Sequence, residues 1–530
     1  MTSLHIVVVC LSLLTLTCIA SLLQRLIKVP LPFLQIGVGV VAALPPINWQ
    51  VPLDPETFFL LFLPLLLFGD GWRLPRRGLM SMPWAVFGHA VVLVLLTTAI
   101  GGYVLHWLVP EMPLSVAFAV GALVSPTDAV AVGAITRNLT VTHRMKHLLE
   151  SEALLNDASG LVAMRLAIAA TLSGSFSPLH AAGELLWVAT VGILIGVGLS
   201  MLYHQIHRRV LVGVGDATLQ TVLMGLLPFA AFALADEVGA SGILAAVAAG
   251  IAASRLSLLE HAHYTARIMT GATWDVVSFC LNGLIFVLLG LQLPGLIGAG
   301  PSGVDLVTSH ERLAILDEIA LLTLALIVIR FVWVLASIGL SRLTNARRDS
   351  IGWRDITASS IAGARGVVTL AGALSIPLVT LDGTPFPYRD LAITVAVGVI
   401  LLSLLIAAVG LPLLLRGRPA ERESDAELVR ARRVAIDAAI NAIEKHHSGE
   451  EERTKFLISA YRGRSMSLDN PRDAEDRGAW RDIYRTALHA ERRAIQKLRA
   501  ADTIDDTVAR QLFSELDLLE AALMLRPLRP

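Results

Sequence analysis

One short segment of the sequence, 150–163, carries acidic side chains in an otherwise apolar stretch. It reads ESEALLNDASGLVA, so Glu150, Glu152, Asn156 and Asp157 fall within eight residues. A carboxyl group buried away from water binds a proton more readily than an exposed one, because desolvation disfavours its charged form. A partly dehydrated cation competes for the same oxygens. The segment therefore predicts a site that holds either a proton or a cation.

These side chains point in different directions from the helix, so we expect them to have different roles. If the helix begins near His147, Asp157 lies about 15 Å along its axis, close to the middle of a bilayer. Glu152 and Asn156 are four residues apart and share a face, whereas Asp157 points about 100° away. We interpret Asp157 as the group that cycles between proton and cation, with Asn156 beside it. Glu150 is a candidate for the ion pathway that leads to this group.

A second polar segment, Ser125-Pro126-Thr127-Asp128, interrupts another apolar stretch. Proline lacks an amide hydrogen and breaks or kinks a helix. The freed carbonyls and the hydroxyls of Ser125 and Thr127 can bind a cation, and the Asp128 carboxylate can offset the positive end of a half-helix. The alternative is a proline kink whose polar side chains satisfy only the backbone.

A third segment, GARGVVTLAG at 363–372, places Arg365 among glycines. A buried arginine cannot lose its proton and needs an anionic partner. Glu152 is the candidate for this structural ion pair, which leaves Asp157 free to cycle. The alternative is that Arg365 extends to the cytoplasmic edge of the bilayer.

Other polar groups in apolar stretches have weaker patterns. Asp70 follows LPLLLFG and either belongs to the ion pathway or caps a helix end near Arg73. Asp275 and Asn282 are candidates for groups that support the site. Arg165 either pairs with a carboxylate or extends outward to the membrane surface.

Long apolar stretches must position these groups. The chain has 530 residues, of which 55% are hydrophobic and 16% charged, and its mean hydropathy is +0.67. Soluble globular chains carry about 25% charged residues, so a polytopic all-α membrane protein is indicated. We predict about thirteen spans of roughly the length that a bilayer requires: 4–23, 29–46, 54–71, 84–108, 112–135, 147–173, 181–203, 218–235, 238–254, 275–296, 314–341, 355–380 and 390–415.

Basic residues in the connecting loops predict the orientation. If the N-terminus is outside, the loops on the cytoplasmic side carry eighteen Lys and Arg residues from Arg25 to Arg418, whereas the opposite loops carry Arg312 and Arg389. This asymmetry obeys the positive-inside rule and places the C-terminus in the cytoplasm. We therefore predict a transmembrane domain at 1–418 and a helical cytoplasmic domain at 419–530, with helices near 424–446, 474–500 and 503–524.

The span numbering also suggests an internal symmetry. Spans 1–6 and 8–13 are seven spans apart, so paired spans run in opposite directions. The Pro-containing fifth span then pairs with the Gly-rich twelfth. Two inverted six-helix repeats with interrupted helices at matching positions are a recurring transporter architecture, with ion sites at the repeat interface.

Four segments in this order resemble the monovalent cation:proton antiporters of the sodium/proton exchanger type, in their bacterial branch: LPLLLFGDGW at 63–72, ALVSPTDAVAV at 122–132, ESEALLNDASGLVA at 150–163 and GARGVVTLAGALSIP at 363–377. The resemblance covers the membrane part up to about residue 415. It implies a homodimer with dimerisation and core domains, alternating access, a carrier carboxylate at Asp157 and a Glu152–Arg365 pair. It also implies that an Asn at position 156 accompanies electroneutral exchange, and it implies a role in sodium tolerance or pH homeostasis.

Two positions depart from the family pattern. Ala153 stands where the family often has Ser, and Gly69 separates Asp70 from the preceding Phe. Both bear on cation coordination and on the choice between sodium and potassium.

These observations together predict a secondary transporter of a bacterial inner membrane, not an enzyme, that exchanges Na+, K+ or Li+ for H+ without a resident cofactor or nucleic-acid partner. Asp157, Asp128 and Thr127 would hold the cation only transiently. The alternative is a gated cation channel with the tail as its sensor, although no symmetric filter loop is found.

Overall fold

The computed structural model describes residues 3–416 except 28, 47–48, 50–54, 74–86, 137–138, 140, 142, 174–177, 212–215, 257–263, 297–308, 344–351 and 381, together with scattered positions after 416. The chain divides into two compact units, Met1–Pro419 and Ala420–Pro530. The predicted tail helices lie outside the described residues apart from those scattered positions.

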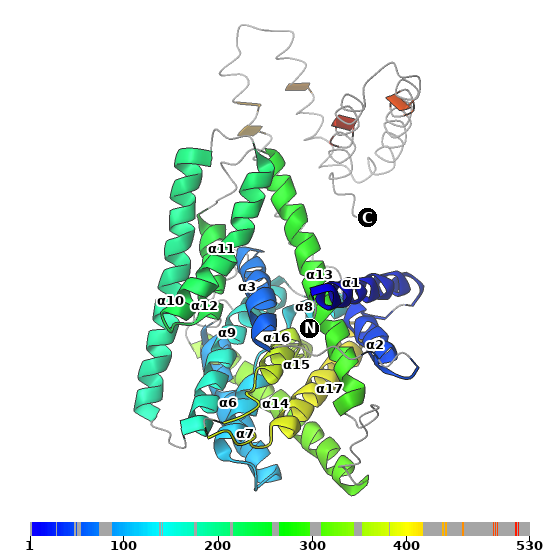
Figure 1. Ribbon diagram of the computed structural model, residues 1–530, viewed down its shortest axis with the longest axis vertical. Helices are drawn as coiled ribbons and strands as arrows, with labels where there is room; N and C mark the ends of the chain where they lie inside the picture. The colour runs from blue at the N-terminus through cyan, green and yellow to red at the C-terminus, as the bar shows by residue number, and fades with distance from the viewer. Residues whose placement is uncertain are drawn as a thin grey trace. The chain divides into compact units, whose positions relative to one another are not determined.

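The described part of the first unit is built from helices and contains no strand (Figure 1). Helices form because apolar side chains face lipid or core while every backbone polar group is satisfied within the helix. The first half comprises α1 (Ser3–Leu26), α2 (Leu31–Ala43), α3 (Pro55–Arg73), the π-helix η1 (Gly88–Val92), α6 (Leu93–Leu108), α7 (Leu114–Leu123), α8 (Ala129–Thr136) and α9 (His143–Ser173). The remainder comprises α10 (Pro178–Ile206), the π-helix η2 (His207–Leu211), α11 (Ala217–Glu237), α12 (Gly242–Arg255), α13 (Tyr264–Leu296), α14 (Ser309–Leu343), α15 (Trp353–Ile361), α16 (Val367–Leu374) and α17 (Arg389–Leu415).

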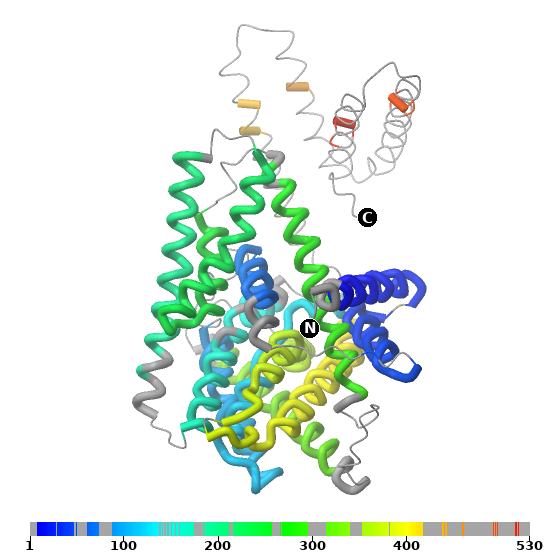
Figure 2. The backbone as a smooth tube through the Cα atoms, viewed as in Figure 1, coloured from blue at the N-terminus to red at the C-terminus, as the bar shows by residue number. Residues whose placement is uncertain are grey.

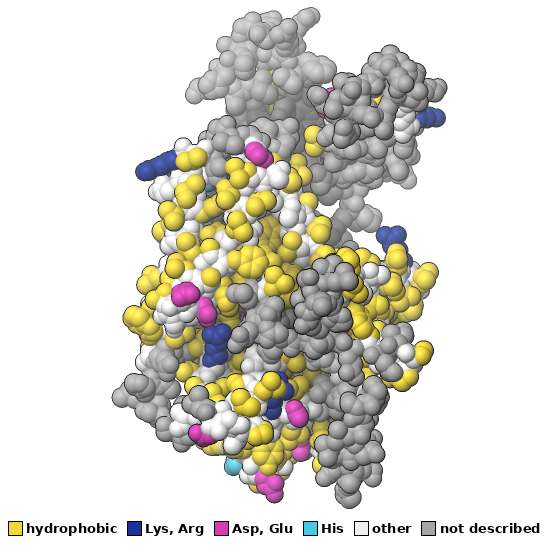
Figure 3. Space-filling model, viewed as in Figure 1, with side chains coloured by type: hydrophobic (Ala, Val, Ile, Leu, Met, Phe, Trp, Pro, Cys, Tyr) yellow, Lys and Arg dark blue, Asp and Glu magenta, His cyan; other side chains and the backbone are white. Residues whose placement is uncertain are grey.

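Length and composition identify the membrane-crossing helices. Within the described residues, eight helical segments are long and apolar enough to cross a bilayer, and α2, α7 and α12 are shorter apolar helices. The face in Figure 3 is mostly hydrophobic where side chains are described, with few charged groups on it. Such a surface suits lipid rather than water. The first unit is therefore the membrane part of a multi-pass protein.

The helices of this unit pack mainly within two sets. In the first set α1, α2 and α3 pack with α10, α11, α12 and α13, and in the second η1 and α6–α9 pack with α14–α17. Figure 2 shows the cyan and yellow parts of the chain side by side in the second set, in agreement with the contacts of α17 with α7 and α8. Each set thus combines segments from the two halves of the sequence.

Two of the predicted spans are interrupted. The span expected at 112–135 is divided into α7 and α8 by residues 124–128, and the one expected at 355–380 is divided into α15 and α16 by residues 362–366. The second span also ends earlier than expected, at Leu374, because Pro377 follows and the residue before a proline disfavours the helical conformation. Conversely, α13 begins at Tyr264, eleven residues before the predicted span start at 275, as the helix continues into a more polar segment.

Candidate functional site

The two interrupted helices meet at their breaks, and Asp128 joins them. Its Oδ1 accepts hydrogen bonds from the backbone N–H groups of Val130 and Ala131, at 2.8 and 3.0 Å, at the start of α8. Its Oδ2 accepts from the N–H of Val367, at 3.3 Å, at the start of α16. A helix N-terminus carries a partial positive charge and unsatisfied N–H groups. A single carboxylate therefore compensates two half-helices from different parts of the sequence.

Arg365 performs the complementary task at the opposite helix ends. Its Nε donates to the carbonyl oxygen of Val124, directly after α7, at 2.7 Å, and its Nη1 donates to the carbonyl of Gly363, just after α15. Helix C-termini carry partial negative charge and unpaired carbonyls, which a guanidinium satisfies. The side chain is buried, so it does not extend to the cytoplasmic edge as the alternative prediction proposed.

Glycine makes the crossing sterically possible. A Cβ on Gly366 would lie 1.7 Å from Oδ2 of Asp128, and a Cβ on Gly160 of α9 would lie 2.4 Å from Cγ of Pro126. Neither distance is tolerable for non-bonded carbon. The absence of side chains at these two positions lets Asp128 reach α16 and lets α9 approach the first break.

A cavity of about 260 Å³ lies beside the crossing. Its walls come from α3 and α13 of the first helix set and from α8, α9, α16 and the two breaks of the second: Leu66, Leu67, Asp70, Arg73, Pro126, Thr127, Asp128, Ala129, Val130, Ala153, Asp157, Asn282, Gly366, Val367, Val368 and Thr369. The volume holds several water molecules. The cavity therefore accommodates a small ion that keeps part of its hydration shell.

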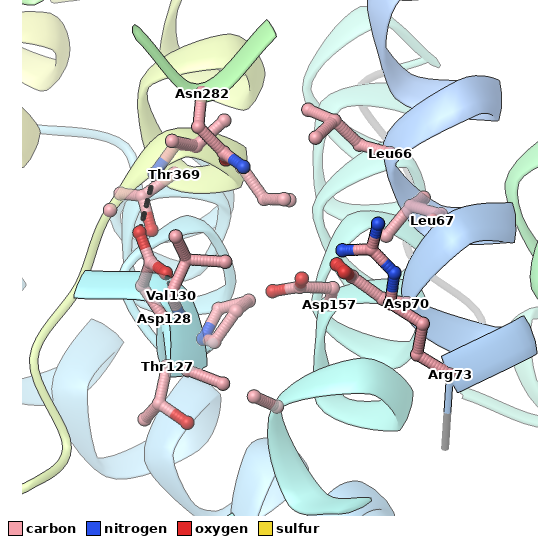
Figure 4. A pocket seen from close by; sticks show the side chains of 16 residues that line it. Leu66, Leu67, Asp70, Arg73, Thr127, Asp128, Val130, Asp157, Asn282 and Thr369 are labelled. Carbon is pink, nitrogen blue, oxygen red and sulfur yellow. Dashed lines mark hydrogen bonds between the residues drawn. The ribbon is translucent and has the colours of Figure 1, made fainter. Parts of the chain in front are cut away.

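Three carboxylates face this cavity. Figure 4 shows Asp157 from α9 and Asp70 from α3 close together in the view, with the Arg73 guanidinium near Asp70 and with Asp128 across the cavity. Arg73 also donates from Nη2 to Oδ1 of Asp275 on α13, at 2.9 Å, and both side chains are exposed to solvent. The cavity is thus acidic overall and attracts cations, with one exposed ion pair near it.

The neutral residues of the predicted site do not all lie at the cavity. Asn156 is buried and its Nδ2 donates to Oγ1 of Thr127 at 2.9 Å, which positions this cavity-lining hydroxyl. Ser125 is buried but does not line the cavity, and its hydroxyl donates to the carbonyl of Ala122 at 3.0 Å. The structure therefore brings Thr127 and Asn156 to Asp157, but not Ser125.

The predicted pair of Glu152 with Arg365 is wrong in this structure. Glu152 pairs with Arg330 of α14 instead, through Nη1 to Oε1 and through Nη2 to Oε2 at 2.9 Å. Both side chains are almost fully buried, at 1% and 4% exposure. Two parallel bonds match the planar guanidinium fork to the carboxylate. Arg330 also donates from Nε to the carbonyl of Ser359 at 2.9 Å.

Arg330 is the main functional candidate that sequence reasoning missed. It is an ionised residue far from both ends of the apolar segment Ala314–Gly339, and such residues in a membrane span need an anionic partner. Of the weaker candidates, Asn282 lines the cavity, Asp275 pairs with Arg73 and Arg165 is exposed. The side chain of Glu150 lies outside the described residues.

An acidic cavity beside two crossed, interrupted helices in a multi-pass membrane unit is typical of the class of secondary ion transporters. Residues 12–417 match the family model described as "Sodium/hydrogen exchanger, transmembrane". The chain belongs to this family of monovalent cation:proton antiporters, which are transporters and not enzymes.

Individual relatives agree with this assignment. The chain is 36% identical to the "Uncharacterized Na(+)/H(+) exchanger YjcE" of Escherichia coli K12, with 94% of each chain covered. It is 37% identical to the sodium, potassium, lithium and rubidium/H+ antiporter of Bacillus subtilis, covering 97% of this chain and 78% of the relative. Among solved structures, the sodium proton antiporter MjNhaP1 of Methanocaldococcus jannaschii shares the fold with a TM-score of 0.60 at 19% identity, covering 79% of this chain and all of the other.

Proposed function

We propose that the protein exchanges Na+, K+ or Li+ for H+ by alternating access and that Asp157 is the shared carrier. The observation that supports this most directly is the position of its carboxylate, in a cavity lined by helices of both packing sets. A proton and a cation cannot occupy the same carboxylate oxygens together. If the cavity opens to one side of the membrane at a time, this mutual exclusion couples the two fluxes.

The other cavity residues have supporting roles in the proposal. Thr127 offers a hydroxyl oxygen that Asn156 positions, and Asp128 contributes negative potential, although three backbone N–H groups already occupy much of its hydrogen-bonding capacity. Asp70 lines the cavity together with Arg73 and Asp157, and we assign it to the ion pathway. We leave Ser125 out of the ligand set because its hydroxyl lies away from the cavity.

Alternating access requires two bodies that move against each other, and the two helix sets are our candidates. The first set contains α1–α3 from the first half of the sequence and α11–α13 from the second half, which are predicted spans 1–3 and 8–10. The second set contains η1 and α6–α9 together with α14–α17, which are spans 4–6 and 11–13. Two inverted repeats would give this division. The proposal includes thirteen spans, an external N-terminus, a cytoplasmic C-terminal domain, an inner-membrane location and the homodimer that the family resemblance implies.

If one carboxylate carries one proton in one direction and one monovalent cation in the other, one positive charge crosses the membrane each way in every cycle. Electroneutral exchange follows if no second group changes charge during the cycle. Support comes from Asn156, which lies next to the carrier and does not ionise, and from Glu152, whose charge is paired with that of Arg330. The Bacillus subtilis relative is named for four alkali cations, so we include potassium among the substrates. The relatives give no support to the channel alternative.

The test is proton release from acid-loaded proteoliposomes, reported by a pH-sensitive dye, on addition of Li+, Na+, K+ or Rb+. We expect the parent protein to respond and Asp157→Asn to lose at least 100-fold in rate. Asp390→Asn is the matched control, because that carboxylate is 97% exposed at the start of α17. Parental exchange in Asp157→Asn would refute the assignment of the carrier. A rate that changes with an imposed membrane potential would refute electroneutrality.

A further inference from the structure

Asn282 of α13 and Thr369 of α16 line the cavity, and the proposed exchange mechanism gives neither of them a role. Figure 4 shows Asn282 and Thr369 on the same side of the cavity as Asp128, with Asp70 and Asp157 on the other side. A cation bound to Asp157 still needs ligands from the opposite direction. Asp128 is poorly suited to supply all of them, since its Oδ1 already accepts two backbone hydrogen bonds.

Thr369 has a hydroxyl that its own helix does not satisfy. Threonines within the long helices, such as Thr98, Thr171 and Thr323, donate to the carbonyl four residues earlier. Thr369 is the third residue of α16, so the residue four positions before it, Arg365, lies in the break rather than in a helix. The Thr369 side chain is 1% exposed and its Oγ1 has no hydrogen-bond partner. A buried hydroxyl without a partner is destabilising unless another ligand uses it.

Asn282 presents an oxygen for a different reason. Its Nδ2 donates to the backbone carbonyl of Ser278 at 2.9 Å. A backbone carbonyl can only accept, so the nitrogen of the amide must be the atom at this contact. The orientation of the amide is thereby fixed, and Oδ1 remains as the acceptor group of a residue that lines the cavity.

We propose that the Thr369 hydroxyl and the Asn282 side-chain carbonyl are neutral ligands of the transported cation and set the preference among alkali ions. This inference rests on the proposed function, with Asp157 as the charged ligand. Thr369 lines the cavity although its Oγ1 is not exposed, so the proposal requires rotation about the Cα–Cβ bond, which would exchange the positions of the hydroxyl and methyl groups. Small ions surrender hydration at greater cost and therefore depend more on the number of protein oxygens that replace it.

The decisive variant is Thr369→Val, which keeps the shape of the side chain and removes the oxygen. Exchange is measured in proteoliposomes over a concentration series of Li+, Na+, K+ and Rb+. We expect the KM for Na+ and Li+ to rise about tenfold and the KM for Rb+ to change less than threefold. Thr369→Ser should retain parental KM values because it keeps the hydroxyl. Thr323→Val is the matched control, since it removes a buried hydroxyl from α14 away from the cavity.

A parental KM and cation ratio in Thr369→Val would overturn the proposal, as would a Thr369→Ser variant that behaves like Thr369→Val. If Thr369→Val does not accumulate as folded protein, Asn282→Ala and Thr369→Ala are assayed for stabilisation against heating by NaCl in detergent, which requires binding only. We expect both variants to need about tenfold more Na+ than the parent for the same stabilisation against heating. A parental Na+ requirement in these variants would overturn the proposal. Asp157→Asn in the same vesicles separates the two hypotheses, because its continued exchange would refute the carrier assignment whatever Thr369 does.

Discussion

Replacing Glu152 by Gln leaves Arg330 charged and buried without its anion. The two side chains are 1% and 4% exposed and make two parallel hydrogen bonds. Removal of one partner of such a pair costs about 3–5 kcal/mol, because the remaining charge keeps its desolvation penalty. We therefore expect Glu152→Gln and Arg330→Met each to destabilise the protein by this amount, measured as unfolding in detergent.

The double variant tests whether the cost arises from the pair. Replacement of both members by groups of similar volume leaves no buried charge, so Glu152→Gln with Arg330→Met should be much more stable than the sum of the single effects. The coupling energy should exceed about 2 kcal/mol. The double-mutant cycle of Glu152→Gln with Arg365→Met is the reference. Its coupling energy should be smaller, because Arg365 donates to helix-end carbonyls and not to Glu152.

Additive effects in the Glu152–Arg330 cycle would refute the pairing. A Glu152→Gln variant within about 0.5 kcal/mol of the parent would refute the argument from burial, as this is the range of ordinary surface substitutions.

Three further predictions concern the crossing and the cavity. Gly366→Ala places a Cβ within 1.7 Å of Asp128 and should abolish exchange in vesicles, whereas Gly133→Ala on α8, where a Cβ meets nothing within 4 Å, should not. Asp128→Ala leaves two helix N-termini uncompensated and should lower the unfolding free energy by about 1–3 kcal/mol, and an unchanged thermal midpoint would contradict this. Asp275→Asn breaks an exposed pair with Arg73 and should change stability by less than about 1 kcal/mol, and a larger change in the same unfolding assay would show that the pair is not solvent-screened.

The class of protein was predictable because it depends on local and compositional properties. A hydrophobic stretch that must satisfy its own backbone becomes a helix wherever it lies in the fold, so the apolar segments were readily found. Pro126 and the glycines around Arg365 weaken the helix locally, and both breaks occur at those positions. The cost of an ionisable group in lipid likewise marked Asp157 and Asp128 before any contact was known.

The partner of Glu152 was not predictable in this way. Arg330 and Arg365 both satisfy the requirement for a buried cation, and they lie 178 and 213 positions from Glu152 in the sequence. Sequence reasoning assigned Arg365 to Glu152 because a buried arginine needs an anionic partner and because the family resemblance implies this pair, and it did not consider Arg330. The fold instead uses the glycines around Arg365 to let Asp128 and Arg365 reach the helix ends, and it leaves Arg330 for the carboxylate.

Ser125 and Thr369 show the same limit for hydroxyl groups. Ser125 belongs to a conspicuous polar segment but donates to its own helix end, whereas Thr369 lies in an apolar run and reaches the cavity wall. Which of these residues lines the cavity depends on how each half-helix is rotated about its axis, and this rotation is set by packing between distant segments.

The sequence by itself determined a multi-pass helical protein with two interrupted spans and a carboxylate deep in the apolar region, because hydropathy, helix breaking and the cost of buried charge act over a few residues. Only the tertiary structure decided that Asp128 and Arg365 compensate four half-helix ends, that Glu152 pairs with Arg330, and which oxygens surround the cavity. The contacts of Asp128 with Val367, of Arg365 with Val124 and of Glu152 with Arg330 join residues more than a hundred positions apart. No local pattern distinguishes one buried charge of the right sign from another.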